Sequence, residues 1–320
     1  MSLVTAGGVE RTAGSATMAG TVPTRTRATM ALPPCDPAAI AADIAEACRR
    51  DGYAVARGVF SPGEAANLAA AFDRQYADGL RHPRSFRHGN FHVRVAEDPG
   101  IGHTVRMVQW PSYGDAVLNA VRLDTRLFHL VEPLLGRDVK QIINQLHWKP
   151  PGAKGGDYAF HQDSRFRRPR EAFRNLATSY VQTGIAVDPH TAESGAMRLY
   201  PGSHLLGELD LAPRANILGT GIAEEALERL GLDPAKLVDL VLEPGDVAFW
   251  SPYTIHGSAA NRSAHDRRLY INGYVRAADC DRGEWTWRDG QPVPLGKPVL
   301  VHYEDLHRRP EPHYVDHAGY

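Results

Sequence analysis

The chain has 320 residues, of which 43% are hydrophobic and 23% charged, a composition typical of globular proteins. Its 36 Lys and Arg nearly balance its 37 Asp and Glu, and the formal net charge of −1 disfavours a general nucleic-acid binder. No stretch approaches the roughly 18 uninterrupted apolar residues of a membrane-spanning helix. The spacing of Cys35, Cys48 and Cys280 suits neither a disulfide framework nor a zinc site, so a reducing, cytoplasmic setting is expected.

Residues 1–34 differ in composition from the rest of the chain. They are rich in Ala, Gly, Thr and Ser and contain almost no large apolar side chain. Such a segment buries too little surface to offset its ordering entropy, which predicts a disordered tail. The two Arg near its end leave a transit peptide as the alternative. We expect residues 35–320 to form a single domain.

The first part of this domain is predicted to be mainly helical. Asp36 and Pro37 are typical of a helix start, and the helix should run to Arg50. A short strand is expected within 51–60, and Ser61 with Glu64 predicts a capping box that opens a second helix, ending near Tyr76. We also expect strands over 91–98 and 103–110 and one amphipathic helix over 115–135.

Beyond residue 135 the pattern changes to strands separated by Gly and Pro turns. Several strands without alternating helices indicate an antiparallel sandwich or jelly roll. The predicted fold is therefore mainly β with flanking helices, in which the N-terminal helices buttress a β-barrel. The expected strands cover 138–150, 178–188, 196–204, 237–250 and 267–277, and a short helix covers 222–231.

The segment FHQDSRF (160–166) carries candidate metal ligands. In an extended segment, residues i and i+2 point the same way, so His161 and Asp163 would present an imidazole and a carboxylate on one side. These are two ligands of the two-histidine, one-carboxylate triad that leaves open positions on iron(II). The triad needs a distant second histidine, for which His256 is the candidate.

Arg267 and Ser258, which both follow His256 in the sequence, could hold an acidic cosubstrate. Arg267 follows His256 by eleven residues, at the start of a predicted strand, and offers a cation for a far carboxylate. Ser258 could add a hydroxyl donor.

Four segments, in this order, resemble the phytanoyl-CoA dioxygenase (PhyH) family of iron(II)- and 2-oxoglutarate-dependent oxygenases. The stretch RRDGYAVARGVFSPGEAANLAAAFD (49–73) is similar to the family's N-terminal strand and helix, and HQD (161–163) to its first two ligands. ESGAMRLYPGSH (193–204) resembles its ENG turn and strand, and EPGDVAFWSPYTIHGSAANRSAHDRR (243–268) its distal-histidine segment. The resemblance implies a cupin-like double-stranded β-helix.

The resemblance also implies a site and a reaction. His161, Asp163 and His256 would bind iron, and Arg267, assisted by Ser258, would hold 2-oxoglutarate. Arg268 is the second choice because it points the other way on a strand, and Gln145 is a further candidate contact to cosubstrate or substrate. The reaction would use O2 to hydroxylate an unactivated C–H of a small molecule and release succinate and CO2; desaturation, epimerisation, cyclisation and epoxidation remain open. The presence of Asp163 argues against halogenation.

Substrate contacts are predicted less directly. The run RFRRPREAFR (165–174) contains five Arg and one Glu and is either a solvated loop or a clamp for an anionic substrate, with Arg165 and Arg168 as candidates. Tyr158 is a candidate for the mouth of the site, and Gly184 stands where many family members have an aromatic residue. By analogy, an intermediate of secondary metabolism is expected as substrate, with no nucleic-acid or membrane partner.

Two other classes of function remain as alternatives. The same scaffold could use a metal for isomerisation or hydrolysis, which would not require Arg267. It could also serve as a non-catalytic binding protein, although intact HxD, His and Arg motifs disfavour that interpretation.

Overall fold

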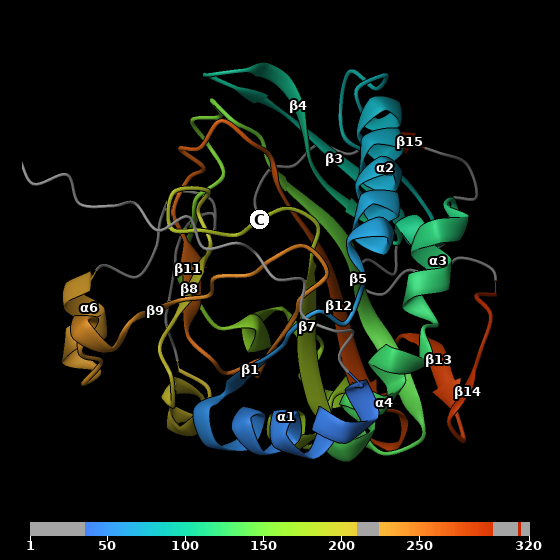
Figure 1. Cartoon of the computed structure of the whole chain (residues 1–320), viewed down its shortest axis with the longest axis vertical. Helices are drawn as coiled ribbons and strands as arrows, with labels where there is room; N and C mark the ends of the chain where they lie inside the picture. The colour runs from blue at the N-terminus through green and yellow to red at the C-terminus, as the bar shows by residue number, and fades with distance from the viewer. Residues whose placement is uncertain (1–35, 210–223, 297–312, 315–320) are drawn as a thin grey trace, which may run out of the picture. The chain divides into compact units, whose positions relative to one another are not determined.

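Two antiparallel sheets, one large and one small, provide the framework of the protein (Figure 1). The computed structural model describes residues 36–209, 224–296 and 313–314, so the tail predicted over 1–34 lies outside the described residues. The strands are β1 Tyr53–Ala56, β2 Phe86–His88, β3 Phe91–Asp98, β4 Gly102–Gln109, β5 Val139–Lys149, β6 Tyr158–His161, β7 Tyr180–Ala186, β8 Met197–Leu199, β9 Val238–Asp239, β10 Val247–Trp250, β11 His256–Ser258, β12 Arg267–Arg276, β13 Glu284–Arg288, β14 Gln291–Pro292 and β15 His313–Tyr314.

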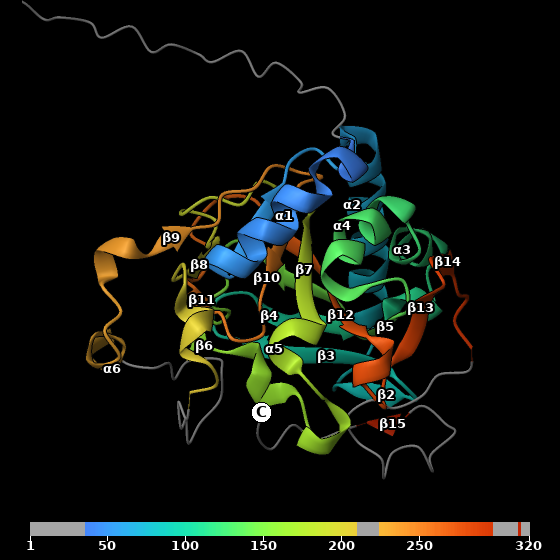
Figure 2. The ribbon, with the colours of Figure 1, turned by 90° about the horizontal axis from the view of Figure 1, so that it is seen from below.

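The strand order is that of a jelly roll, because strands distant in the sequence alternate within each sheet. The large sheet runs β1-β10-β7-β12-β5-β4-β3-β2-β15, with the β13–β14 pair attached to β5. The small sheet runs β6-β11-β8-β9. In both views the small sheet lies to the left of β7 and β12 (Figures 1 and 2). The predicted mainly β fold with N-terminal helices is confirmed.

Helices from the first part of the chain pack on the large sheet. The α-helices are α1 Pro37–Asp51, α2 Pro62–Gly79, α3 Ala116–Arg122, α4 Thr125–Leu135, α5 Leu176–Ser179 and α6 Glu224–Arg229. One buried cluster joins Ile44 of α1, Phe72 of α2 and Val131 of α4 to Phe249 and Tyr270 of the sheet. Each such large apolar side chain contributes about 1.5–3 kcal/mol on burial. This packing leaves the other face of β12 and β5 for the site. None of the described helices is long and apolar enough to cross a membrane.

The predicted helix starts agree with the structure. Asp36 accepts a hydrogen bond from the amide of Ala38, and Ser61 and Glu64 form the reciprocal capping box. The two caps fix how α1 and α2 enter the fold, since each satisfies amides that lack an intrahelical partner.

The single helix predicted over 115–135 is wrong, because α3 ends at Arg122 and α4 begins at Thr125. Asp124 has extended backbone geometry and accepts the amide of Arg126, so it caps a new helix instead of continuing the old one.

The strand predicted over 237–250 is also divided. β9 belongs to the small sheet and β10 to the large sheet, so the chain changes sheets between Asp239 and Val247. Gly245 makes this change possible, because its φ of +92° belongs to the left-handed region and a Cβ there would collide with the carbonyl of Phe60. Likewise, only 197–199 of the strand expected over 196–204 is extended in a sheet, and a 3₁₀ turn follows at Ser203–Leu206.

Gly245→Ala should destabilise the protein more than Gly58→Ala. Gly58 also has a positive φ (+60°), but nothing lies within 4 Å of its would-be Cβ, so only backbone strain of about 1–2 kcal/mol is expected there. At Gly245, overpacking adds about 1–3 kcal/mol to that strain. Urea unfolding of both variants measures the difference, and equal losses in the free energy of unfolding would contradict the assigned role of Gly245.

Candidate metal centre

A cavity of about 400 Å³ lies where the two sheets meet. β12 and β5 of the large sheet form one wall, and the small sheet supplies residues from β6 and β11. Nine of the ten predicted site residues line it: His161, Asp163, His256, Arg267, Ser258, Gln145, Tyr158, Arg165 and Arg168. Gly184 does not line it, because the side chains of Leu269 and Trp250 lie over the position that its Cβ would occupy.

The three candidate metal ligands converge in this cavity. His256 on β11 pairs in register with His161 on β6, so the two imidazoles lie side by side with ring centroids 4.3 Å apart. Asp163 Oδ1 lies 3.7 Å from His161 Nε2, and Asp163 Oδ2 lies 3.8 Å from His256 Nε2. One ligand atom from each residue lies within 4.8 Å of the others. Three donors with this spacing can occupy one face of a single ion.

The element that positions Asp163 differs from the predicted extended segment. β6 ends at His161, and Asp163 begins the 3₁₀ turn Asp163–Phe166. The two residues therefore do not share the face of one strand. The turn brings the carboxylate back toward the histidine, and Trp250 of β10 fixes it by donating its Nε1 proton to Oδ2 at 2.9 Å.

Hydrogen bonds set both imidazoles in the state that a metal needs. His161 Nδ1 lies 2.6 Å from the carbonyl of Ala159, and His256 Nδ1 lies 2.9 Å from the carbonyl of Thr254. A carbonyl only accepts, so each Nδ1 carries the proton and each Nε2 presents a lone pair toward Asp163. Burial lowers the pKa of His256 to about 4, so this ring is neutral near pH 7. Burial opposes ionisation of Asp163, but His256 and His161 outweigh it and lower the pKa of the carboxyl group.

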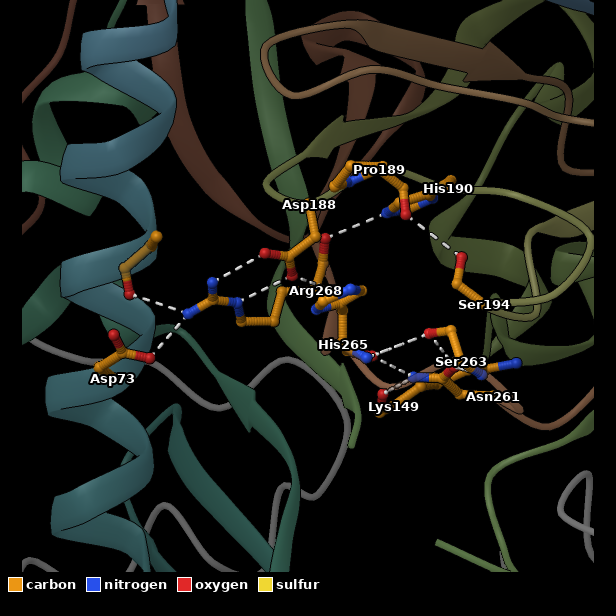
Figure 3. Close-up of polar contacts among 11 residues, drawn as sticks. Asp73, Lys149, Asp188, Pro189, His190, Ser194, Asn261, Ser263, His265 and Arg268 are labelled. Carbon is orange, nitrogen blue, oxygen red and sulfur yellow. Dashed lines mark hydrogen bonds and ion pairs between the residues drawn. The ribbon is translucent and has the colours of Figure 1, made fainter. Parts of the chain in front are cut away.

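Arg267 and Arg268, which are neighbours on β12, face opposite sides of the sheet. Arg267 is 4% exposed and lines the cavity, and its side chain makes no hydrogen bond or ion pair with any described residue. Burial lowers its pKa to about 10, so it stays protonated at neutral pH. Arg268 instead pairs with Asp188 and reaches Asp73 of α2 (Figure 3). The geometry thus favours Arg267 over Arg268 as the cation of the site.

Lys149 is a neighbour of Arg267 that sequence reasoning missed. The two residues are directly paired across β5 and β12. Lys149 is 2% exposed, and its Nζ donates to Ser258 Oγ and to the carbonyl of Ala259, both at 2.6 Å. Because the Ser258 oxygen accepts from Lys149, its own proton is free to be donated into the cavity. Its position at the end of a strand predicted to line the site was the available signal.

Gln145 belongs to a short hydrogen-bonded chain on the cavity wall. Its Oε1 lies 3.0 Å from His147 Nε2, and His147 Nδ1 lies 3.1 Å from the hydroxyl of Tyr158. Burial lowers the pKa of His147 to about 3, so the ring is neutral, donates to Gln145 and accepts from Tyr158. The amide protons of Gln145 then remain available to a ligand.

The arginines of the run 165–174 differ in burial and in their ion-pair partners. Arg168 is half exposed and lies 3.9 Å from Glu208, which also pairs with Arg170, whereas Arg174 pairs with Asp281. Arg167, which belongs to the clamp expected from the sequence, is 1% exposed and lines the cavity. Nothing in the sequence distinguishes it from the arginines beside it. Arg94 and Arg106, on strands β3 and β4, also line the cavity, and sequence reasoning missed both.

Comparisons with known proteins agree with this geometry. The family model described as phytanoyl-CoA dioxygenase (PhyH) matches residues 48–269. A dioxygenase, lolE1, from Epichloe uncinata is 28% identical over 45% of this chain and 49% of its own length. A methylphosphonate hydroxylase from Gimesia maris is 30% identical over 49% and 53%, so the chain spans about half the length of these two relatives. An ectoine dioxygenase from Bordetella parapertussis is 23% identical over 72% and 73%.

Solved structures share the fold. EctD from S. alaskensis with bound Fe superposes with a TM-score of 0.60 at 21% identity, over 82% of this chain and 84% of that one. The epimerase SnoN, in complex with Fe3+, alpha-ketoglutarate and nogalamycin RO, gives 0.56 at 24% identity, over 83% and 95%. The jelly roll, the converging triad and the family match over most of the described residues lead to one conclusion: the chain belongs to the phytanoyl-CoA dioxygenase family.

Proposed function

We propose that the protein is an iron(II)- and 2-oxoglutarate-dependent dioxygenase that hydroxylates an unactivated C–H of a small, anionic organic substrate. The observation that carries the proposal is the juxtaposition, in one cavity, of His161, Asp163 and His256 with Arg267, a buried cation that pairs with no described carboxylate. A metal centre alone would not need such a cation, whereas a dicarboxylate cosubstrate would.

The residues present fit both groups. Two neutral imidazoles and one carboxylate suit iron(II), and three donors on one face leave positions for further ligands. Arg267 has a guanidinium whose Nε lacks any partner among the described residues, and such a fork suits a carboxylate. When bound, iron(II) and 2-oxoglutarate would supply the oxidising chemistry, with O2 consumed and succinate and CO2 released.

The chain's own groups bind, orient and exclude water. We assign His161, Asp163 and His256 to the metal, and Arg267 to the distal carboxylate of 2-oxoglutarate. Ser258, oriented by Lys149, adds a hydroxyl donor to the same carboxylate, and the amide of Gln145 is a further contact.

The other walls suit a small organic substrate. Apolar side chains of Ile143, Leu269 and Ile271 line the cavity and keep water from the target C–H. Arg165 and Arg168 also line it, which favours a substrate of opposite charge. Tyr158, held by His147, contributes a polar edge to the wall.

Asp163→Ala should abolish iron binding and turnover. Loss of a residue that merely orients a metal ligand costs about 10–100-fold in affinity, so loss of the only anionic ligand should cost more than about 100-fold. The measurement is an anaerobic titration with iron(II) and then 2-oxoglutarate, following the visible charge-transfer band. Asp239→Ala, which removes a surface carboxylate of β9, is the control and should retain the band. An unchanged band in the Asp163 variant would remove this residue from the ligand set.

Arg267→Met should raise the KM for 2-oxoglutarate about 10–100-fold, because a charged hydrogen bond is worth about 1.5–3 kcal/mol. Arg268→Met is the matched control, since that side chain joins Asp188 and Asp73 and its loss should lower thermal stability instead. Steady-state kinetics with varied 2-oxoglutarate, together with a melting curve, separates the two. An unchanged KM for 2-oxoglutarate in Arg267→Met would mean that Arg268 or another cation holds the cosubstrate.

Lys149→Met should also raise the KM for 2-oxoglutarate, but only where Ser258 is present. Lys149 touches Ser258 and two carbonyls, so its effect on the cosubstrate should pass through the serine hydroxyl. In a double-mutant cycle with Ser258→Ala, the second substitution should then add little to the first. Fully additive effects would mean that Lys149 acts on the cosubstrate by another route.

A further inference from the structure

Arg167 is a buried cation that forms no ion pair with any described residue. It follows the turn Asp163–Phe166 and is 1% exposed. Its guanidinium lies 4.8 Å from the ring centroid of Tyr180 and makes a long hydrogen bond of 3.4 Å to Gln182 Oε1. Its Nε has no partner, and no carboxylate in the described part of the chain lies within ion-pair distance. A buried guanidinium normally requires an ion pair, so this arrangement is incomplete without an anion.

Gln182 beside it presents further unused donors. Its Oε1 accepts from the hydroxyl of Tyr180 as well as from Arg167. Its amide nitrogen makes no hydrogen bond with the described residues, and the side chain lines the cavity. Arg167 and Gln182 therefore offer N–H groups and no free acceptor, which is the recognition chemistry of an oxyanion.

This pair lies far from the position assigned to the 2-oxoglutarate carboxylate. Gln182 is paired with Gly273 of β12, and Arg267 begins the same strand. Gly273 lies six positions after Arg267 on this strand, which is a distance on the order of 20 Å at about 3.3 Å per residue. Leu269 and Ile271 lie between them on the cavity wall. One five-carbon cosubstrate chelated to the metal and held by Arg267 does not also fill the Arg167 end.

We propose that the substrate carries a carboxylate or similar oxyanion that pairs with Arg167 and accepts from Gln182, while its hydrocarbon part lies along Ile143 and Ile271. The proposal rests on the proposed function only in treating the ligand of this cavity as the substrate. It places the acidic group next to the turn that bears Asp163.

Two other roles for Arg167 make different predictions. If the residue supported the fold through Tyr180, its removal would lower the free energy of unfolding. If it balanced the charge of Asp163, its removal would change iron affinity. If Arg167 instead binds the substrate, its removal should neither lower the free energy of unfolding nor change iron affinity. Because such a residue is kept at the expense of stability, Arg167→Gln should unfold at the same or a higher urea concentration than the wild type.

The experiment compares two ligands of equal shape, 4-phenylbutyrate and 4-phenylbutyramide, which differ in charge. Isothermal titration calorimetry under argon measures their affinities, with and without iron(II) and saturating 2-oxoglutarate. Wild-type protein should bind the carboxylate at least about tenfold more tightly than the amide, since a charged hydrogen bond accounts for such a factor. Arg167→Gln should abolish this preference and leave the affinity for 2-oxoglutarate within twofold.

Further variants separate charge, geometry and folding. If Arg167→Gln folds poorly, Arg167→Lys takes its place in the comparison. This variant keeps the charge and should keep part of the preference for the carboxylate. Gln182→Glu places an internal carboxylate beside Arg167 and should abolish the preference at nearly constant shape. Arg229→Gln removes an exposed arginine of α6 and should change nothing.

Three results would overturn the inference: no preference in the wild type, a preference retained in Arg167→Gln, or an equal weakening of 2-oxoglutarate. Failure of the proposed function gives another pattern. The charge-transfer band would be absent from the wild type, while the preference that depends on Arg167 would persist in calorimetry without metal. The anion site would then stand on its own.

Discussion

The hydrogen bond from Trp250 to Asp163 joins the two sheets at the point where the site is built. Trp250 belongs to β10 of the large sheet, and Asp163 follows β6 of the small sheet. The pairing of β11 with β6 places His256 opposite His161, but neither histidine fixes where the carboxylate lies. The indole does so, because it donates to one carboxylate oxygen and holds it beside His256. The arrangement of both sheets, and of the helices that cover the large one, is what keeps this bond in place.

The site contains more positive charge than its own carboxylates balance. Arg267 and Arg167 are both buried, and neither makes an ion pair within the described residues, whereas Arg106 and Arg268 pair with Asp98 and Asp188. Unpaired buried charge is costly, so proteins retain it where a ligand supplies the counter-ion. We propose these two arginines as the positions of two anions. An acidic cosubstrate at one and an acidic substrate at the other would complete the balance of charge.

Hydroxyl, amide and imidazole groups around the cavity are oriented before any ligand enters. Lys149 occupies the oxygen of Ser258, and His147 occupies the oxygen of Gln145, so both side chains present protons to the cavity. Such prior orientation reduces the entropy that binding must overcome. It also makes the site selective for acceptors, since a ligand that brings donors would leave these N–H and O–H groups unpaired.

The sequence by itself determined the class of fold, the helix caps and the three residues that converge as candidate metal ligands. Those features depend on local patterns: the alternation of strands, Asp36 and Ser61 as caps, and the HxD motif with a distant histidine. It did not place the break at Asp124 or the change of sheet at Gly245, because these depend on contacts with distant backbone. Only the tertiary structure decided which arginines of the run are buried. Arg167 and Arg168 are adjacent in the sequence and alike in charge, but the fold buries one beside Tyr180 and leaves the other half exposed.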